Sequence, residues 1–105
     1  MENLDSTFAA LSDSTRRAIL AQLMLGETKL SELAAPFDMS QTAVSKHVRV
    51  LSESGLLTVE KRGRTRHCRL NAEPMKQAVE FLTDYQVFWT QQFDNLGEFL
   101  ANEEN

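Results

Sequence analysis

Apolar residues recur at helical spacing along the first third of the chain, and capping residues divide that pattern into three segments. The first segment predicts a short helix over residues 4–11. A second helix is expected between Asp13, a suitable N-cap, and Gly26, a residue that suits a helix C-terminus. Thr28 can cap a third helix over residues 29–37. This part of the chain is therefore expected to be helical.

A fourth helix follows after a connection of two residues. Ser40 is its expected N-cap and Gly55 its end, so two helices joined by a tight turn occupy about residues 29–54. At 100° per residue the fourth helix gathers its apolar residues on one side. The opposite side is hydrogen-bonding and cationic, and carries Gln41, Thr42, Ser45, Lys46 and Arg49. A recognition helix presents such a face to the major groove of DNA.

Beyond Gly55 the pattern changes from helical spacing to alternation. The segments LLTVEKR and TRHCRL predict two strands joined around Arg62 and Gly63, which form a two-stranded β wing over about residues 56–70. From about residue 72 to 101 the chain predicts one long helix with an apolar stripe. The predicted fold is mainly α (α+β), a winged helix-turn-helix with a long C-terminal helix.

Length and composition place these elements in a single domain. The chain has 105 residues, which allows one modest core over residues 1–105. No apolar run approaches the roughly 18 residues of a membrane span, and the first residues, MENLDSTF, lack a secretion pattern. The one cysteine excludes an internal disulfide. We expect a cytoplasmic protein that has no membrane partner.

Charge is distributed unevenly along this acidic chain. The formal net charge is −4, yet residues 40–70 hold seven basic and two acidic residues. Both flanking regions carry more acidic than basic residues. One basic face on an anionic body indicates a polyanion partner, and the helix and hairpin within that face favour double-stranded DNA.

The order of these elements resembles the ArsR family of winged helix-turn-helix bacterial repressors. The segments that carry the resemblance are FAALSDSTRRAIL, LSELA, MSQTAVSKHVRVL, SGLLTVEKRGR and CRL. The resemblance implies a homodimer that pairs through its first and last helices and represses a promoter until a signal releases it. Ser14 and Cys68 depart from the residues that the family often has, which are a proline and an aromatic residue.

Metal sensing is not carried over from the family. Its metal-sensing members have cysteine pairs in the third helix or His, Asp and Glu sets in the last helix. The third helix here offers Lys29, Ser31 and Glu32, and the last helix has neither histidine nor cysteine. We therefore expect no metal site and no cofactor, and the sequence identifies no effector.

The DNA-contacting residues follow from the polar helix face and the wing tip. The residues assigned to DNA are Ser40, Gln41, Thr42, Ser45, Lys46, Arg49, Arg62, Arg64 and Arg66. The first helical residues suit base edges or nearby phosphates, and the wing arginines suit the minor groove or the backbone. A solvated helix face and a solubilising hairpin tip are the competing interpretations, but a solubilising tip normally mixes charge signs, and this one has no acid between Lys61 and Leu70.

The last helix carries more aromatic residues than one small body can cover. This excess indicates a partner helix, most simply a second copy across a two-fold axis. With the first helix included, the expected dimer contacts are Leu4, Phe8, Phe81, Tyr85, Phe88, Trp89, Phe93 and Leu96. An effector pocket between the paired helices is an open alternative.

Four further residues each have two interpretations. His47 faces the core side of its helix, which favours a satisfied, half-buried histidine over a ligand or a pH switch. Cys68 lies on the inward face of its strand, which favours an inert core thiol over a redox sensor. Arg16 and Arg17 begin a helix, where the helix dipole disfavours cations; an external phosphate and a salt bridge are equal candidates for their partner.

The sequence therefore predicts a homodimeric DNA-binding transcriptional regulator, acting as a repressor at an inverted-repeat operator. The alternative from another class is a protein-interaction module that works through the aromatic helix. An enzyme is the weakest hypothesis, because no histidine, carboxylate and nucleophile converge at a recognisable spacing. We assign no catalytic residue.

Overall fold

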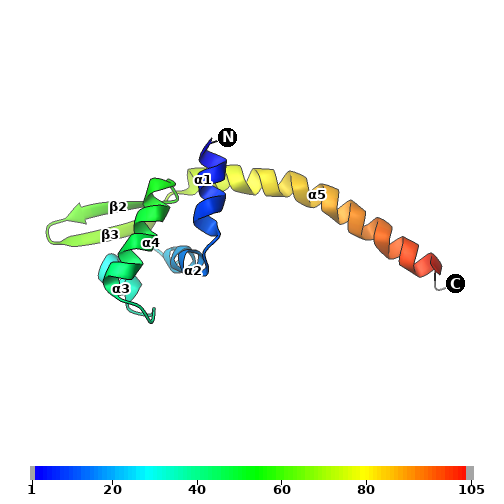
Figure 1. The fold of residues 1–105 in the computed structure, drawn as a ribbon. Coiled ribbons are helices and arrows are strands. Elements are labelled where there is room, and N and C mark those ends of the chain that lie inside the picture. The colour runs from blue at the N-terminus through cyan, green and yellow to red at the C-terminus, as the bar shows by residue number, and fades with distance from the viewer. Residues whose placement is uncertain (1, 104–105) are drawn as a thin grey trace.

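The computed structural model describes residues 2–103, so the first residue and residues 104–105 of the predicted domain lie outside the described residues. The elements in chain order are α1 (Glu2–Leu11), α2 (Ser14–Leu23), β1 (Thr28–Lys29), α3 (Leu30–Ala34), α4 (Gln41–Glu53), β2 (Leu57–Arg62), β3 (Thr65–Leu70) and α5 (Ala72–Glu103). The mainly helical fold with a hairpin wing and a long last helix is confirmed (Figure 1).

The sheet has three strands instead of the predicted two. Its order is β1-β3-β2, and all pairs are antiparallel. Thr28 pairs with Cys68 in β3, so the prediction that Thr28 caps the third helix is wrong. Its hydroxyl donates instead to the carbonyl of Gly26. Because Thr28 and Lys29 are drawn into the sheet, α3 begins at Leu30. It also ends at Ala34, near Pro36, so residues 35–40 connect it to α4 and the predicted connection of two residues is wrong.

One continuous core holds α1 to α4 against the base of the sheet. Its largest fully buried apolar side chains come from α2, α3, α4 and the turn into β2: Ile19, Leu33, Val44, Leu51, Leu56 and Leu57. Their burial follows from the helical stripes of α2, α3 and α4, which face one another across this core. The core fixes α4 against α2 and leaves the opposite side of α4 outside.

The first two helices are joined by arginines that bind backbone carbonyls. The Asp13 side chain accepts from the N–H of Arg16 at 3.1 Å and so caps α2 as predicted. The Arg16 guanidinium donates to the carbonyls of Ala10 and Ala9, at 2.7 and 3.2 Å, and Arg17 donates to the carbonyl of Leu11 at 2.7 Å. Within residues 2–103 neither arginine forms the expected salt bridge: both bind the C-terminal carbonyls of α1, where the helix dipole favours cations. The external phosphate stays a prediction.

A tight approach at Gly55 places the start of α5. Gly55 has a φ of +83°, and a Cβ there would lie 3.3 Å from Cγ of Pro74. The N–H of Asn71 donates to the carbonyl of Leu56 at 2.9 Å, which ties the end of β3 to the same turn. The direction in which α5 leaves the body is therefore set at this junction.

Only the first part of α5 packs on the rest of the chain. Ala78 is buried, and Phe81 meets Phe8 of α1 edge to face, with ring centroids 5.8 Å apart. From Val79 to Glu103 every residue is exposed. The helix projects from the body, and the molecule measures 69 × 30 × 21 Å along its principal axes (Figure 1).

Candidate nucleic-acid interface

The fourth helix has the two faces that its sequence predicts. The Ser40 hydroxyl accepts from the N–H of Ala43 at 3.1 Å and caps the helix. Val44, Val48 and Leu51 are buried. The opposite face is open to solvent at Gln41, Thr42, Lys46 and Arg49, and Ser45 is partly buried. Core packing thus orients this polar face outward without help from a ligand.

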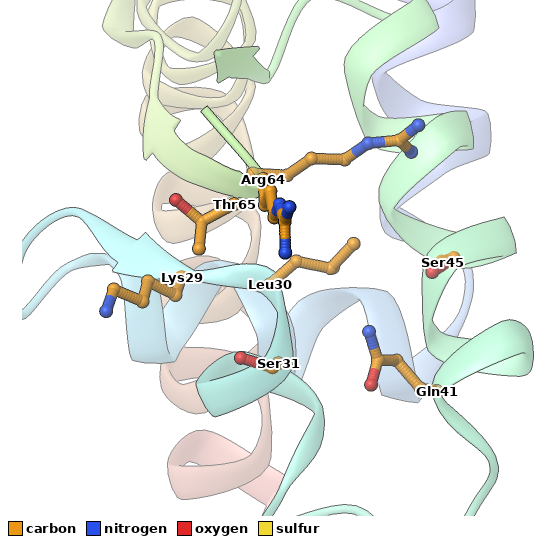
Figure 2. Close-up of a pocket in the computed structure, with 8 residues that line it drawn as sticks. Lys29, Leu30, Ser31, Gln41, Ser45, Arg64 and Thr65 are labelled. Carbon is orange, nitrogen blue, oxygen red and sulfur yellow. The ribbon is translucent and has the colours of Figure 1, made fainter. Parts of the chain in front are cut away.

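The wing lies beside the first turn of α4, and together they form a hollow. This hollow of about 280 Å³ is lined by Lys29, Leu30, Ser31, Gln41, Ser45, Arg64, Thr65 and Arg66. Figure 2 shows Gln41 and Ser45 on the α4 side of this hollow, and Arg64 and Thr65 on the wing side. Residues predicted separately from the helix and the hairpin therefore meet at one concave surface.

A second hollow of about 510 Å³ continues along α4 from the first. Its polar and charged lining consists of Thr42, Ser45, Lys46, Arg49, Ser52, Glu53 and Arg66. Ser45 and Arg66 line both hollows, so the two form one groove between α4 and the wing, which we call the α4–wing groove. This groove contains all the predicted DNA-contacting residues except Ser40, at its edge, and Arg62.

Three cations of the groove have no acidic partner in the described part of the chain. Lys46, Arg64 and Arg66 form no ion pair within residues 2–103. Arg49 is held at 3.0 Å by Glu53, one turn later on the exposed surface of α4. Exposed pairs of this kind contribute little to stability and exchange readily, so Arg49 is also available to a phosphate.

Arg62 is in a different situation, because two carboxylates bind it. Its guanidinium donates to both oxygens of Glu27 at 3.0 Å and to Glu60 at 2.9 Å. Hydrogen bonds from Arg62 lower the pKa of Glu60, and the hydrogen bonds to Glu60 and Glu27 raise the pKa of Arg62. Arg69 joins the same cluster at 3.4 Å from Glu60. Arg62 therefore fastens the wing to the loop before β1.

His47 and Cys68 both lie on the packing side, as predicted. The His47 ring is 22% exposed, with Nδ1 3.7 Å from the Asp13 carboxylate and 3.4 Å from the Arg16 guanidinium. It connects α4 to the start of α2. Cys68 is fully buried between β1 and β2, and burial raises the pKa of its thiol.

The sequence did not single out Lys29, Ser31 and Thr65 for DNA, yet they line the α4–wing groove. Lys29 and Ser31 are brought there by the pairing of β1 with β3, which cannot be read from local spacing. The position of Thr65 beside the arginines of the wing tip is the one signal that could have indicated its place.

Four of the predicted dimer residues form a row of rings along α5. Phe81 stacks on Tyr85 at 5.5 Å, Tyr85 contacts Trp89 at 6.2 Å, and Trp89 contacts Phe93 at 6.0 Å. Their exposed fractions run from 42% at Trp89 to 65% at Phe93. We call this surface the aromatic face of α5. Apart from the contact of Phe81 with Phe8, it is a contiguous apolar surface that the rest of the described chain leaves open.

Two general features complete the description of residues 2–103. No three His, Cys, Asp or Glu side chains in this range are grouped so that they could hold a metal ion. Despite the length of α5, none of the helices in this range has the apolar stretch that crossing a membrane requires.

Known proteins match most of the chain. A helix-turn-helix domain model matches residues 11–60. The uncharacterized HTH-type transcriptional regulator YuzN of Bacillus subtilis is 40% identical over 85 residues, which cover 74% of this chain and 92% of YuzN. A solved ArsR family transcriptional regulator is also 40% identical, with a TM-score of 0.78 over 85% of this chain and 92% of that chain.

Two more distant matches have names that state a direction of control or an assembly. The transcriptional repressor SdpR of Bacillus subtilis is 24% identical over 82 residues, 78% of this chain and 91% of SdpR. A homodimeric winged helix-turn-helix DNA-binding domain from Mycobacterium bovis is 21% identical, with a TM-score of 0.67 over 82% of each chain. At that identity the second match shows only a shared fold.

Proposed function

The chain belongs to the ArsR family of winged helix-turn-helix transcriptional regulators, and from this premise we propose that it is a homodimeric repressor that binds an inverted-repeat operator through its α4–wing groove. The observation that carries this proposal is the groove itself. Hydrogen-bonding side chains on α4 line one concave surface with Lys46, Arg64 and Arg66, three cations that have no acidic partner within residues 2–103.

Each part of the groove has a distinct role in the proposed complex. Gln41, Thr42 and Ser45 are near the N-terminus of α4, so they reach base edges when that helix enters the major groove. Lys46, Arg49 and Arg66 neutralise phosphates beside it, and Arg64 extends from the wing tip toward the backbone or the minor groove. Phosphate contacts supply affinity, and α4 supplies sequence choice.

Homodimer formation is supported by the aromatic face of α5. A single chain leaves these rings in solvent, and a second copy would bury them across a two-fold axis. Two α4 helices would then enter successive major grooves about 34 Å apart, which requires an operator with two-fold symmetry. SdpR, which bears the name repressor, supports repression as the direction of control.

The remaining parts of the proposal concern chemistry and location. We propose no reaction for the protein, since no histidine, carboxylate and nucleophile converge at a recognisable spacing in its sequence. A regulator of this kind acts where the chromosome is accessible, so we place it in the bacterial cytoplasm. We propose no metal site, because α3 lacks the cysteine pair and α5 the histidines found in the metal sensors that the family includes.

The test begins with selection of genomic fragments by the purified protein, followed by fluorescence anisotropy on a selected site at several salt concentrations. Lys46→Ala and Arg64→Ala should each weaken binding about tenfold and reduce the magnitude of the log–log salt slope by about one. Lys76→Gln removes a cation from α5, outside the groove, and serves as the matched control. Unchanged binding by the Lys46 and Arg64 double variant would refute the proposed role of the groove.

A further inference from the structure

A second concave site lies on a different side of the molecule, at the junction of α2, the base of the wing and α5. This cavity of about 560 Å³ is lined by Leu20, Met24, Leu56, Leu70, Asn71, Ala72, Met75, Lys76 and Val79. Its volume is in the range of small-molecule sites. Met24, Leu70 and Val79 are exposed, by 76%, 37% and 52%, although all three are apolar. We call it the junction cavity.

The junction cavity is separate from the proposed dimer surface. At 100° per residue, Val79 is turned about 160° from Phe81 and about 80° from Trp89, so it borders the aromatic face of α5. Lys76 lies nine positions before Tyr85 and is therefore turned about 180° from it. Pairing of two copies through the aromatic face would leave the Lys76 side of this cavity open. A ligand could enter it in the dimer.

The charge of the residues that line the cavity indicates which class of ligand it would bind. Lys76 is the one ionisable side chain among the lining residues, and it is exposed at the rim. It is also the only basic residue after Arg69, and every other charged residue of α5 is acidic. The cavity includes Ala72, the first residue of α5, but Glu73 in the same turn offsets the helix dipole, so Lys76 carries the attraction for an anion. An apolar wall with one cation at its rim fits an apolar molecule that carries one negative charge.

We propose that the junction cavity binds a small apolar monocarboxylate, with its hydrocarbon part among Leu20, Leu56 and Met75 and its carboxylate at Lys76. The exposed Met24 side chain is unbranched and adapts to ligands of different shape. Leu70, at the end of β3, and Asn71, just before α5, both line the cavity. We therefore expect a bound ligand to change the angle at which α5 leaves the wing. This regulatory effect rests on the proposed function, whereas binding itself does not.

Titration calorimetry with decanoate, on the full chain without DNA, tests the binding step. Decanoate should bind with a Kd on the order of 100 µM or tighter. Val79→Glu places a carboxylate at the cavity wall and should weaken binding at least about tenfold, because a second negative charge faces the ligand. Val87→Glu is the matched control, since Val87 is exposed on α5 outside the cavity and should leave decanoate affinity unchanged.

Decanol separates the contribution of charge from that of the apolar wall. Lys76→Gln should weaken decanoate binding by about two- to fivefold and leave decanol binding unaltered, as expected for an exposed ion pair. No heat of binding with decanoate up to millimolar concentrations would overturn the proposal. Equal decanoate affinity of Val79→Glu and the wild type would overturn it as well. If Val79→Glu abolished the dimer but kept decanoate binding, the cavity would be a contact between protein chains, and the proposal would also be overturned. Decanoate binding without any effect on operator affinity would retain the site and overturn its regulatory role.

Discussion

Arg62, the last residue of β2, donates two hydrogen bonds of 3.0 Å to the carboxylate of Glu27, which precedes β1 and lies 35 positions earlier in the chain. Paired donors and acceptors of this kind have the preferred arginine–carboxylate geometry. The pair crosses the sheet, since β3 lies between β1 and β2. It therefore places a negative charge beside the arginines that the proposed complex uses.

Glu27→Gln should strengthen DNA binding by about two- to fivefold at low salt, because it releases Arg62 from one carboxylate and removes an anion near the phosphates. Anisotropy titration on the selected operator measures the change, which should shrink as salt is added. Glu98→Gln, an equal change of charge far along α5, is the control. Weaker binding by Glu27→Gln would show that the pair serves mainly to hold the wing in position.

The Arg62–Glu27 pair illustrates what the sequence could not predict. Ser40 as a cap, Gly55 as a terminator and the hairpin turn at Gly63 are local signals, and each was confirmed. Thr28 lies in a strand because it pairs with Cys68 of β3, which is forty positions later in the chain. Its capping tendency is a real local preference, but pairing at the sheet edge satisfies more backbone groups.

The two arginines at the start of α2 show the same limit for electrostatic predictions from the sequence. Considered alone, Arg16 and Arg17 oppose the dipole of their own helix. In the fold they meet the carbonyl end of α1, so the same charges are favourable there. Which helix end lies nearby is a property of the tertiary arrangement. For the groove, helical phase predicted the face of α4, but the approach of Lys29 and Thr65 required the folded sheet.

Asp13 should make the stability of the protein sensitive to acid. The hydrogen bond from the N–H of Arg16 is the largest cause that lowers the pKa of this carboxyl below its ordinary value of 3.8, and the nearby His47 lowers it further. A lowered folded-state pKa contributes stability above the unfolded-state pKa, and this contribution is lost as the pH falls through the folded-state pKa. The loss should therefore occur below about pH 4.

Asp13→Asn isolates this contribution, because asparagine also caps helices but does not titrate. Its Tm should fall less than the wild-type Tm between about pH 5 and about pH 3, measured by circular dichroism. Glu60 also has a lowered pKa, but it titrates in both proteins, so it cancels in the comparison. Parallel Tm curves for the two proteins would refute the role of Asp13.

Cys68 should report on unfolding and not on redox state. Its side chain is fully buried and burial raises its pKa, so the reactive thiolate is scarce in the folded protein. A thiol-specific chromogenic reagent should label the native protein at least about a hundredfold more slowly than the urea-unfolded protein. Operator binding should be the same before and after mild peroxide treatment. Rapid labelling of the native protein would contradict this expectation and would favour a redox-sensing role for Cys68.

Substitutions at Cys68 should separate packing from polarity. Cys68→Ser places a hydroxyl among apolar neighbours of β1 and β2 and should cost about 1–3 kcal/mol of unfolding free energy. Cys68→Ala removes the sulfur without adding a polar group. Chemical denaturation should therefore find the serine variant to be no more stable than the alanine variant, whereas a clearly more stable serine variant would indicate a hydrogen-bond partner for the hydroxyl.

Trp89 should control assembly. Its ring contacts Tyr85, Phe88 and Phe93 at the centre of the aromatic face, so an aspartate there would carry a charge into the proposed two-fold contact. Trp89→Asp should shift sedimentation from dimer to monomer and weaken operator binding by about a hundredfold or more, since one half-site then binds alone. Val87→Asp is the matched control, because Val87 is 68% exposed and lies on the opposite side of α5. A monomeric Trp89→Asp that keeps full operator affinity would argue for a partner other than a second copy, and would favour the protein-interaction alternative for this helix.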